Sequence, residues 1–275
     1  MVTFKDRCLE LRERGFTLAE IVRATKRPKT SVYFHIRGIR LSEDRLSALR
    51  KVATERICSY STARKGKSEK AFTRQKHWTP ATVLLIAHLI FDGEIRRAGI
   101  YNNRSKALLD QVERCMKSIY SYGPTRYTNT KTGVSRISFY NVELATYLSE
   151  LALELKLKIP KMPLRFQREF LRAFFDDEGC IDFRPESNRR KVRGYQKDVR
   201  ILKLVQMLLS RFYIASQVVF PNEVVISGKE NLQRFEKEVN FSPGIYMNGG
   251  RRNSRWKKDI EKRVLLRRAI TSFKS

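Results

Sequence analysis

Two twelve-residue stretches of the chain share one pattern of apolar, acidic and glycine residues. They are residues 84–95, LLIAHLIFDGEI, and residues 170–181, FLRAFFDDEGCI. Each is an apolar, helix-like run that ends in an acid followed by glycine, so that Asp92 and Glu178 occupy matching places. Because the match also aligns Ala87 with Ala173, it predicts two copies of one folded unit rather than a short solenoid repeat.

The acid of each stretch falls in the last turn of its predicted helix. Gly93 and Gly179 stand where a helix often needs a left-handed residue at its end. A carboxylate there faces the negative end of the helix dipole, which costs roughly 0.3–1 kcal/mol. Basic side chains or a divalent metal would offset this cost, and hard oxygen ligands suit Mg²⁺. Two such ends side by side would let Asp92 and Glu178 share metal ions across a phosphodiester. For one copy alone, the alternative is an ordinary buried helix with an acidic end.

Each stretch resembles the LAGLIDADG motif of homing endonucleases, and two stretches in one chain resemble the monomeric members of that family. The resemblance covers roughly residues 78–240. It implies an α+β fold, in which a pseudo-two-fold pair of αββαββα units binds double-stranded DNA with antiparallel sheets. It also implies Mg²⁺ or another divalent metal held by Asp92, Glu178, Gly93 and Asp177, and no small-molecule cofactor.

The charge of the chain points to the same kind of partner. Its 275 residues include 57 Lys and Arg against 28 Asp and Glu, a net charge of +29. This excess indicates a polyanion, most simply nucleic acid. The hydrophobic content of 41 % argues against a disordered basic tail. The four cysteines show no CxxC spacing and the three histidines are far apart, so neither a zinc site nor a disulfide framework is expected.

The sequence also predicts where the protein is found. No run reaches the roughly 18 apolar residues of a membrane span. The N-terminus, MVTFK, lacks the apolar region of a signal peptide. We therefore expect no membrane partner and a cytoplasmic, nucleoid-associated location in a prokaryotic-type cell.

Residues 1–58 are predicted to form an all-helical DNA-binding domain. Three short helices, with breaks near Gly15 and Pro28, resemble a helix-turn-helix. In that motif the third helix lies in the major groove, where its early exposed side chains reach base edges. The residues that this predicts to contact DNA are Lys29, Thr30, Ser31, Tyr33 and Arg37. Many small helical bundles share this pattern, so a bundle without a DNA contact is the alternative.

The rest of the chain divides into a basic linker at 59–77, the first LAGLIDADG repeat at 78–160, the second at 161–245 and a basic C-terminal helix or tail at 246–275. Outward basic and polar side chains on the strands of the repeats are expected to read base edges in the major groove. The candidates are Arg96, Arg126, Arg136, Arg184, Arg189, Arg193 and Tyr195. For each one alone, a solvated side chain or a phosphate contact is the alternative.

One dipeptide in the second repeat is more specific. Gln196-Lys197 closes the second predicted strand, and a Gln-Lys pair at this place resembles archaeal intron-encoded members of the family. There the lysine lies near the active site. The resemblance therefore implies that Gln196 and Lys197 assist the two acids in catalysis, with an ordinary surface lysine as the alternative. The first repeat has Asn102-Asn103 instead.

Together these features predict a site-specific double-strand DNA endonuclease that works as a monomer. In the mechanism that the resemblance implies, a metal-activated water attacks phosphorus in line. Two other classes stay open. One is a cleavage-inactive transcription regulator with the LAGLIDADG fold, which would not need the two acids. The other is an RNA-binding maturase that helps an intron fold, which would prefer structured RNA to duplex DNA at matched salt.

Overall fold

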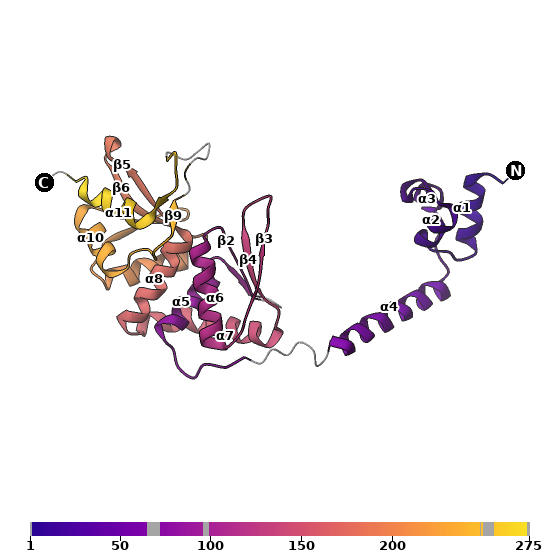
Figure 1. Cartoon of the computed structure of the whole chain (residues 1–275), viewed down its shortest axis with the longest axis horizontal. Helices are drawn as coiled ribbons and strands as arrows, with labels where there is room; N and C mark the ends of the chain where they lie inside the picture. The colour runs from indigo at the N-terminus through magenta and orange to yellow at the C-terminus, as the bar shows by residue number, and fades with distance from the viewer. Residues whose placement is uncertain (1, 65–71, 96–98, 248, 250–255, 274–275) are drawn as a thin grey trace. The chain divides into compact units, whose positions relative to one another are not determined.

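The computed structural model describes residues 2–64, 72–95, 99–247, 249 and 256–273. The chain divides into two compact units, Met1–Glu69 and Lys70–Ser275, and both can be followed by colour in Figure 1. Each unit has a hydrophobic core of its own.

The described part of the first unit is helical. Its helices are α1 (Phe4–Glu13), α2 (Leu18–Thr25), α3 (Lys29–Ile36) and α4 (Glu43–Arg64). Thr3 and Thr17 begin α1 and α2 through capping boxes, in which hydroxyl and carboxylate satisfy two backbone N–H groups reciprocally. The core of α1 to α3 consists of Cys8, Leu11, Ile21, Val32 and Ile36. The predicted all-helical domain is confirmed.

Helix α4 ends later than the predicted domain boundary at residue 58. It continues to Arg64, into the segment expected to be a linker. Residues 59–64 contain neither glycine nor proline, and the first glycine of this region is Gly66. Because an exposed helix needs no apolar stripe, polar residues without a helix breaker can extend it.

The second unit contains the predicted αββαββα order twice. The first copy is α5 (Pro80–Phe91), β1 (Gly93–Ile95), β2 (Gly99–Asn103), α6 (Lys106–Tyr120), β3 (Thr125–Thr128), β4 (Ser135–Phe139) and α7 (Val142–Lys158). The second copy is α8 (Leu164–Glu178), β5 (Gly179–Arg184), β6 (Arg189–Tyr195), α9 (Val199–Ser210), β7 (Ser216–Val219), β8 (Glu223–Ser227) and α10 (Lys229–Glu238). Short 3₁₀ turns lie at Ile159–Lys161 and Pro185–Ser187.

The two copies also form sheets of identical topology. Each sheet has four antiparallel strands, in the order β1-β2-β4-β3 in the first copy and β5-β6-β8-β7 in the second. In both, the strand that follows the acid-bearing helix lies at the edge. The registers correspond, with Gly93 opposite Tyr101 in one sheet and Gly179 opposite Gly194 in the other. This correspondence makes residue-by-residue comparison of the copies possible.

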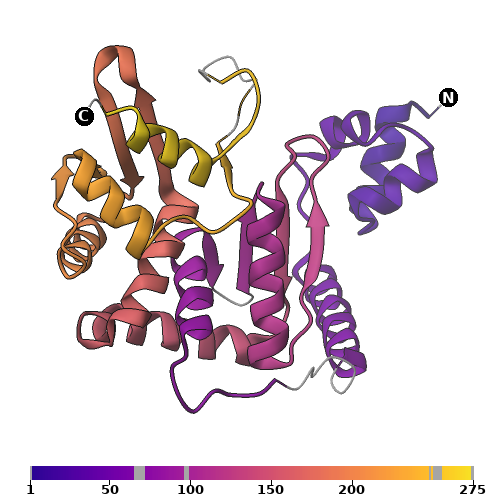
Figure 2. The same ribbon diagram turned by 60° about the vertical axis from the view of Figure 1, so that its left-hand side comes forward.

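Helices α5 and α8 pack against each other and hold the two copies together. They lie side by side in both Figure 1 and Figure 2. Ala87 and Ala173 are fully buried, as expected for helices that approach closely. The Phe91 ring of α5 packs edge-on against Phe170 and Phe174 of α8, with ring centroids 5.3 and 5.2 Å apart.

The glycines that follow the acids have a different purpose from the predicted one. Neither has a left-handed backbone, and Gly179 is extended, with φ −92° and ψ 148°. A Cβ on Gly93 would lie 2.3 Å from the Leu89 carbonyl oxygen, and one on Gly179 would lie 2.3 Å from the Phe175 carbonyl oxygen. The prediction of left-handed caps was therefore wrong. Glycine is required because the chain turns from helix to strand directly over the preceding turn.

After α10 the chain adds a further segment to the second unit. This segment contains β9 (Tyr246–Met247), β10 (Ile260–Glu261) and α11 (Lys262–Thr271), and β10 pairs antiparallel with β9. Helix α11 packs against α10 and β5 and buries apolar side chains in the main core, among them Leu265 and Leu266. No helix in the described ranges is long and apolar enough to cross a membrane.

Candidate active site

Asp92 and Glu178 lie where the two packed helices end and their edge strands begin. Asp92 is the C-cap of α5 and donates its backbone N–H to the His88 carbonyl at 3.1 Å. Glu178 is the last residue of α8. Both acids are half-buried. They are close enough for the charge of Asp92 to raise the pKa of Glu178. The structure thus brings the two predicted acids together at neighbouring helix ends.

Each acid receives a side-chain amide from the end of the second strand of its copy. Asn103 donates through Nδ2 to Asp92 Oδ2 at 2.8 Å, and Gln196 donates through Nε2 to Glu178 Oε1 at 3.4 Å. By the strand registers, Asn103 and Gln196 are equivalent positions. The first of these hydrogen bonds is short and the second is near the limit of a hydrogen bond.

The same registers shift the expected match of Gln196-Lys197 with Asn102-Asn103 by one residue. Gln196 matches Asn103, so Lys197 matches Arg104 rather than Asn103. Lys197 and Arg104 are both exposed, and each directly follows the amide residue that binds the acid of its copy. The Gln196 side chain is fixed, because its Oε1 accepts the backbone N–H of Lys197 at 2.8 Å.

Burial and mutual repulsion shape the electrostatics of the acid pair. Burial raises the pKa of Asp92 to about 7, with a further increase from the charge of Asp177. Burial likewise raises the pKa of Glu178 to about 7, with Asp92 and Asp177 adding to the effect. Near neutral pH the two carboxylates are therefore poised between protonated and ionised forms, and a cation between them would favour the ionised forms.

Asp177, predicted as a metal ligand, lies in a buried polar network instead. Its Oδ2 is 2.8 Å from His88 Nδ1, and its Oδ1 accepts the hydroxyl of Tyr101 at 2.7 Å. The Asp177 side chain is fully buried. Burial opposes protonation of His88, but the negative charges of Asp177, Asp176 and Asp92 together outweigh it and raise the pKa of the histidine. Both its oxygens are engaged by His88 and Tyr101, so Asp177 binds these two residues in this structure. Its role as a metal ligand stays a prediction.

This network reaches Asp92. Asn103 Nδ2, which donates to Asp92, also lies 3.3 Å from the Tyr101 hydroxyl oxygen. Asp92 is therefore connected through Asn103 and Tyr101 to the buried Asp177. The sequence did not indicate Tyr101 and His88 as parts of the site, because their partner Asp177 lies 76 and 89 residues away along the chain. Asn103, only 11 residues from Asp92, was named as part of the Asn102-Asn103 pair but not as a partner of the acid.

The remaining residues fit a hard divalent cation. The two carboxylates offer oxygen ligands, and their pKa values are raised first by burial and then by neighbouring negative charge, both of which a bound cation would counteract. Within the described residues no group of three or more His, Cys, Asp or Glu is arranged to hold a metal ion. A metal here would therefore take only a few protein ligands and complete its shell with water and phosphate oxygens. Gly93, the fourth predicted ligand, is half-buried next to Asp92 and could contribute only its carbonyl.

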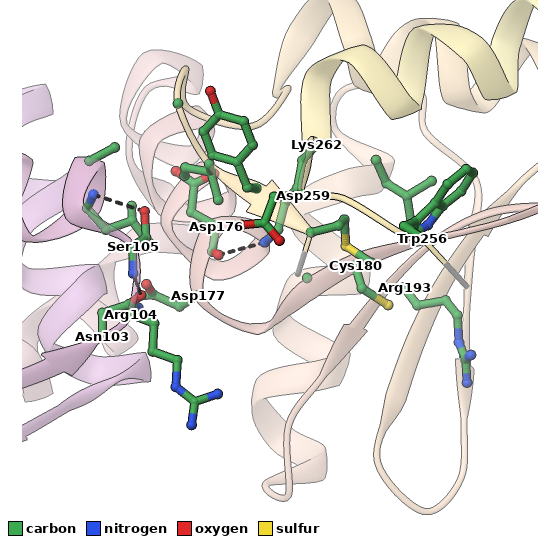
Figure 3. A pocket seen from close by; sticks show the side chains of 18 of the residues that line it. Asn103, Arg104, Ser105, Asp176, Asp177, Cys180, Arg193, Trp256, Asp259 and Lys262 are labelled. Atoms are coloured by element: carbon green, nitrogen blue, oxygen red, sulfur yellow. Dashed lines mark hydrogen bonds between the residues drawn. The ribbon is translucent and has the colours of Figure 1, made fainter. Parts of the chain in front are cut away.

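A basic residue that the sequence analysis did not single out lies beside this centre. Lys262, the first residue of α11, is only 6 % exposed, and its ammonium donates to backbone carbonyls at the end of α8. It lines a cavity of about 720 Å³ together with residues of both copies, among them Arg104, Asp177 and Arg193. Figure 3 shows Lys262 pointing to the Asp176 carbonyl oxygen.

The predicted DNA-contacting residues of the first unit are all on the surface. Lys29, Thr30, Ser31 and Tyr33 are exposed on α3, and Arg37 is exposed just after it. The buried residues of α3 are Val32 and Ile36 on its other face. The helix therefore presents to solvent one lysine and two hydroxyl side chains together with the aromatic Tyr33 and Phe34. This placement is compatible with the expected DNA contact.

Most of the predicted DNA-contacting residues of the sheets have partners within the protein. Arg126 pairs with Asp110 at 2.6 Å, and Arg193 donates to Glu223 at 2.9 Å. The others are Arg184, which is 3.2 Å from Asp182, and Arg136, which donates to Asn102 at 3.0 Å. Tyr195 is half-buried, Arg189 is exposed at the β5–β6 turn, and Arg96 lies outside the described residues.

One part of the second unit matches a known protein family. Residues 165–240, from α8 to the end of α10, match the family model described as LAGLIDADG-like domain. A probable translation initiation factor IF-2 of Pyrococcus horikoshii is 34 % identical over 101 residues. This match includes 37 % of the chain but spans only 9 % of that relative's length.

Several solved structures are similar at low sequence identity. The homing endonuclease I-DmoI in complex with DNA and Mn is 12 % identical, with a TM-score of 0.45, 58 % of this chain covered and 96 % of that one. Full-length DUF199/WhiA from Thermatoga maritima is 13 % identical, with a TM-score of 0.48, 74 % of this chain covered and 64 % of that one. The N-terminal LAGLIDADG domain of DUF199/WhiA is 13 % identical, with a TM-score of 0.46, 61 % of this chain covered and 85 % of that one.

Proposed function

We propose, from the premise that residues 165–240 are a LAGLIDADG-like domain, that the protein is a site-specific, metal-dependent double-strand DNA endonuclease. One observation carries the proposal. Asp92 and Glu178 stand at equivalent helix ends, half-buried, each with an amide donor, and each with its pKa raised to about 7. An acid pair of this kind suits chemistry at a phosphodiester better than it suits structural packing.

Asp92 and Glu178 would hold Mg²⁺ in this proposal. Bound Mg²⁺ would neutralise negative charge on the phosphodiester as the bond breaks. The chain's own groups orient the acids. Asn103 fixes Asp92, and Gln196 fixes Glu178 while its own oxygen is held by the Lys197 N–H. Lys197 and Arg104 would contact phosphate oxygens on either side of the centre.

DNA binding in this proposal rests on charge and on two surfaces. A net charge of +29 favours a polyanion. The sheets of the second unit would bind the duplex around the acid pair, and α3 of the first unit would read a separate segment through Lys29, Thr30 and Ser31. Because one chain contains both acid-bearing helices, a monomer would suffice for both strands.

The direct test is cleavage of a pooled duplex-DNA library with Mg²⁺, with cut ends read by sequencing. We expect defined cuts with the wild-type protein and none with Asp92→Asn or Glu178→Gln. Both substitutions keep the volume of the side chain and remove its charge. Cuts that persist in either variant would contradict the proposed active site.

The second candidate is a DNA-binding transcription regulator without cleavage. The observation in its favour is that Arg126, Arg184 and Arg193 pair with acids of the protein, while the side chains of α3 predicted to contact DNA are exposed. The library separates the two candidates. Enrichment of one sequence without cuts, unchanged in Asp92→Asn and Glu178→Gln, would identify the regulator.

A further inference from the structure

The C-terminal end of α8 has a cation that comes from outside both αββαββα copies. Lys262 donates from Nζ to the Asp176 carbonyl at 2.8 Å and to the Phe175 carbonyl at 3.2 Å. These are carbonyls of the last helical turn, where the negative end of the helix dipole is concentrated. They precede Glu178 by two and three residues. Lys262 thus holds the backbone turn from which Glu178 projects.

The lysine is itself held in place by the C-terminal segment. Its backbone N–H donates to the Ile245 carbonyl at 2.8 Å, beside the β9–β10 pair. Its ammonium lies 5.1 Å from the centre of the Phe241 ring. Glu261, the preceding residue, accepts the Gly244 N–H at 2.9 Å. These contacts fix the direction of the Lys262 side chain before any substrate is present.

The burial of Lys262 costs free energy that packing alone would not require. Moving an ammonium out of water is unfavourable, and burial accordingly lowers the pKa of Lys262, while Asp176 and Asp177 oppose this effect. Within the described residues no carboxylate lies within 4 Å of its Nζ to form an ion pair. Its ammonium donates to carbonyls at the end of α8 instead. Its positive charge acts to lower the pKa of Asp92, Asp176 and Glu178.

The end of α5 is held by other means. There the Asp92 carbonyl lies 3.5 Å from the Asn102 N–H of β2, and the Asp92 side chain is fixed by Asn103 at 2.8 Å. The amide partner of Glu178 is more distant, at 3.4 Å. Glu178 therefore depends more on its backbone for its position.

We propose that Lys262 is a positioning residue for Glu178, so that cleavage requires the C-terminal segment as well as the two repeats. The proposal rests on the proposed function. The role of Lys262 is to fix the last turn of α8 and to keep a positive charge beside the acid pair. It does not contact the reacting atoms in this arrangement.

The test uses the full chain and the DNA site obtained from the library. Lys262→Met keeps the apolar stem and removes the ammonium, and Lys258→Met removes one charge from an exposed position of the same segment as the control. With enzyme in excess over DNA, we expect the single-turnover cleavage rate of Lys262→Met to fall by at least about 30-fold. DNA affinity should stay within about threefold of wild type, since Lys262 is buried. Lys258→Met should cleave within about threefold of wild type at saturating enzyme.

Chemical rescue tests the ammonium itself. Lys262→Ala would leave room that opens on the 720 Å³ cavity, so a small amine can enter from solvent. We expect ethylammonium chloride to restore at least about tenfold of the lost rate, and tetramethylammonium chloride at equal ionic strength to restore none, because it has no N–H donor. A loss caused only by a defect in packing would not respond to either salt.

The outcomes separate this inference from the proposed function. Wild type that does not cut would overturn both. Wild type that cuts, with Lys262→Met unimpaired or Lys262→Ala not rescued by ethylammonium, would overturn the role of Lys262 and leave the endonuclease proposal intact. Slow cleavage by Lys262→Met together with specific rescue would support the inference.

Discussion

The two αββαββα copies have one topology but surround their acids differently. At the end of α5, Asp92 is connected through Asn103 and Tyr101 to the buried Asp177 and His88. At the end of α8, a distant amide and a buried lysine from the C-terminal segment take their place. Both copies therefore place a half-buried carboxylate at the end of a helix. The side chains that hold these two carboxylates in place differ between the copies.

Two equivalent positions that carry different residues in the two copies explain much of this difference. His88 of α5 occupies the place that Phe174 occupies in α8, and Tyr101 occupies the place of Gly194. In the first copy the two rings meet, with centroids 5.9 Å apart, and both bind Asp177. In the second copy the only ring at these two positions is that of Phe174 in α8. A Cβ on Gly194 would lie 2.4 Å from this ring. Phe174 thus needs a glycine opposite it, where His88 has a tyrosine.

The largest effect that tests what the copies share is expected at the glycines after the acids. Gly93→Ala and Gly179→Ala should each lower the free energy of unfolding by roughly 2–3 kcal/mol, because the new Cβ would meet a backbone carbonyl at 2.3 Å. Chemical denaturation measures this, and Gly123→Ala, which has nothing within 4 Å of its Cβ, is the control. Near-neutral effects in either copy would show that the helix-to-strand connection is looser than described.

The network that joins His88 and Tyr101 of the first copy to Asp177 of α8 should respond next. Tyr101→Phe removes the hydroxyl that donates to Asp177 and leaves a buried carboxylate oxygen without that donor, so we expect a loss of about 1–3 kcal/mol. The same denaturation assay measures it. Tyr127→Phe, at an exposed tyrosine of β3, should be neutral within about 0.5 kcal/mol. An equally neutral Tyr101→Phe would mean that Asp177 does not depend on this contact.

The two amides provide a smaller and sharper comparison. Asn103→Ala removes a 2.8 Å hydrogen bond to its acid, whereas Gln196→Ala removes one of 3.4 Å. We expect the single-turnover cleavage rate to fall by about tenfold for Asn103→Ala and by about threefold for Gln196→Ala, since a hydrogen bond weakens as it lengthens. The reverse order would indicate that Glu178 needs its side-chain partner more than Asp92 does.

The smallest expected effect concerns pH. The pKa values of Asp92 and Glu178 are raised to about 7 by folding, so the folded state binds more protons than the unfolded state between about pH 4 and 7. Metal-free stability should therefore fall as pH rises through this window. Asp92→Asn and Glu178→Gln each remove one ionisable carboxyl and with it part of this loss of stability. Without metal we expect them to raise the thermal midpoint by about 2–4 °C at pH 8 and by less at pH 5.

The exposed acid Glu150 of α7 gives the control for this prediction. Glu150→Gln should change the midpoint by less than about 1 °C at both pH values, since surface substitutions have small effects on stability. Equal midpoints for wild type, Asp92→Asn and Glu178→Gln at pH 8 would contradict the raised pKa values of the acid pair.

The features that could be predicted from the sequence are those with a local pattern. The two stretches around Asp92 and Glu178 predicted the packed helices, and the family resemblance that they carry implied the αββαββα order. The need for glycine at Gly93 and Gly179 was also visible. Its cause was not, because a glycine required for close approach looks the same in a sequence as one required for a left-handed backbone.

The features that could not be predicted depend on contacts between distant segments. His88 and Asp177 are 89 residues apart, and neither residue alone indicates the other. Lys262 is one of ten basic residues after residue 250. The packing of α11 on the second copy buries it, which distinguishes it from the other basic residues of this segment that the structure describes. The match of Lys197 with Arg104 required the strand registers.

The central claim is that Asp92 and Glu178 form one active centre. It is tested most directly by strand-resolved single-turnover cleavage of the selected DNA site by Asp92→Asn, by Glu178→Gln and by the double variant. We predict that each single variant loses about 10³-fold in rate on both strands, equivalent to ~4 kcal/mol of barrier. The double variant should lose little more, since the acids act as a unit. Undiminished cleavage of either strand by a single variant, or a double variant whose loss is the product of the two single losses, would contradict the claim.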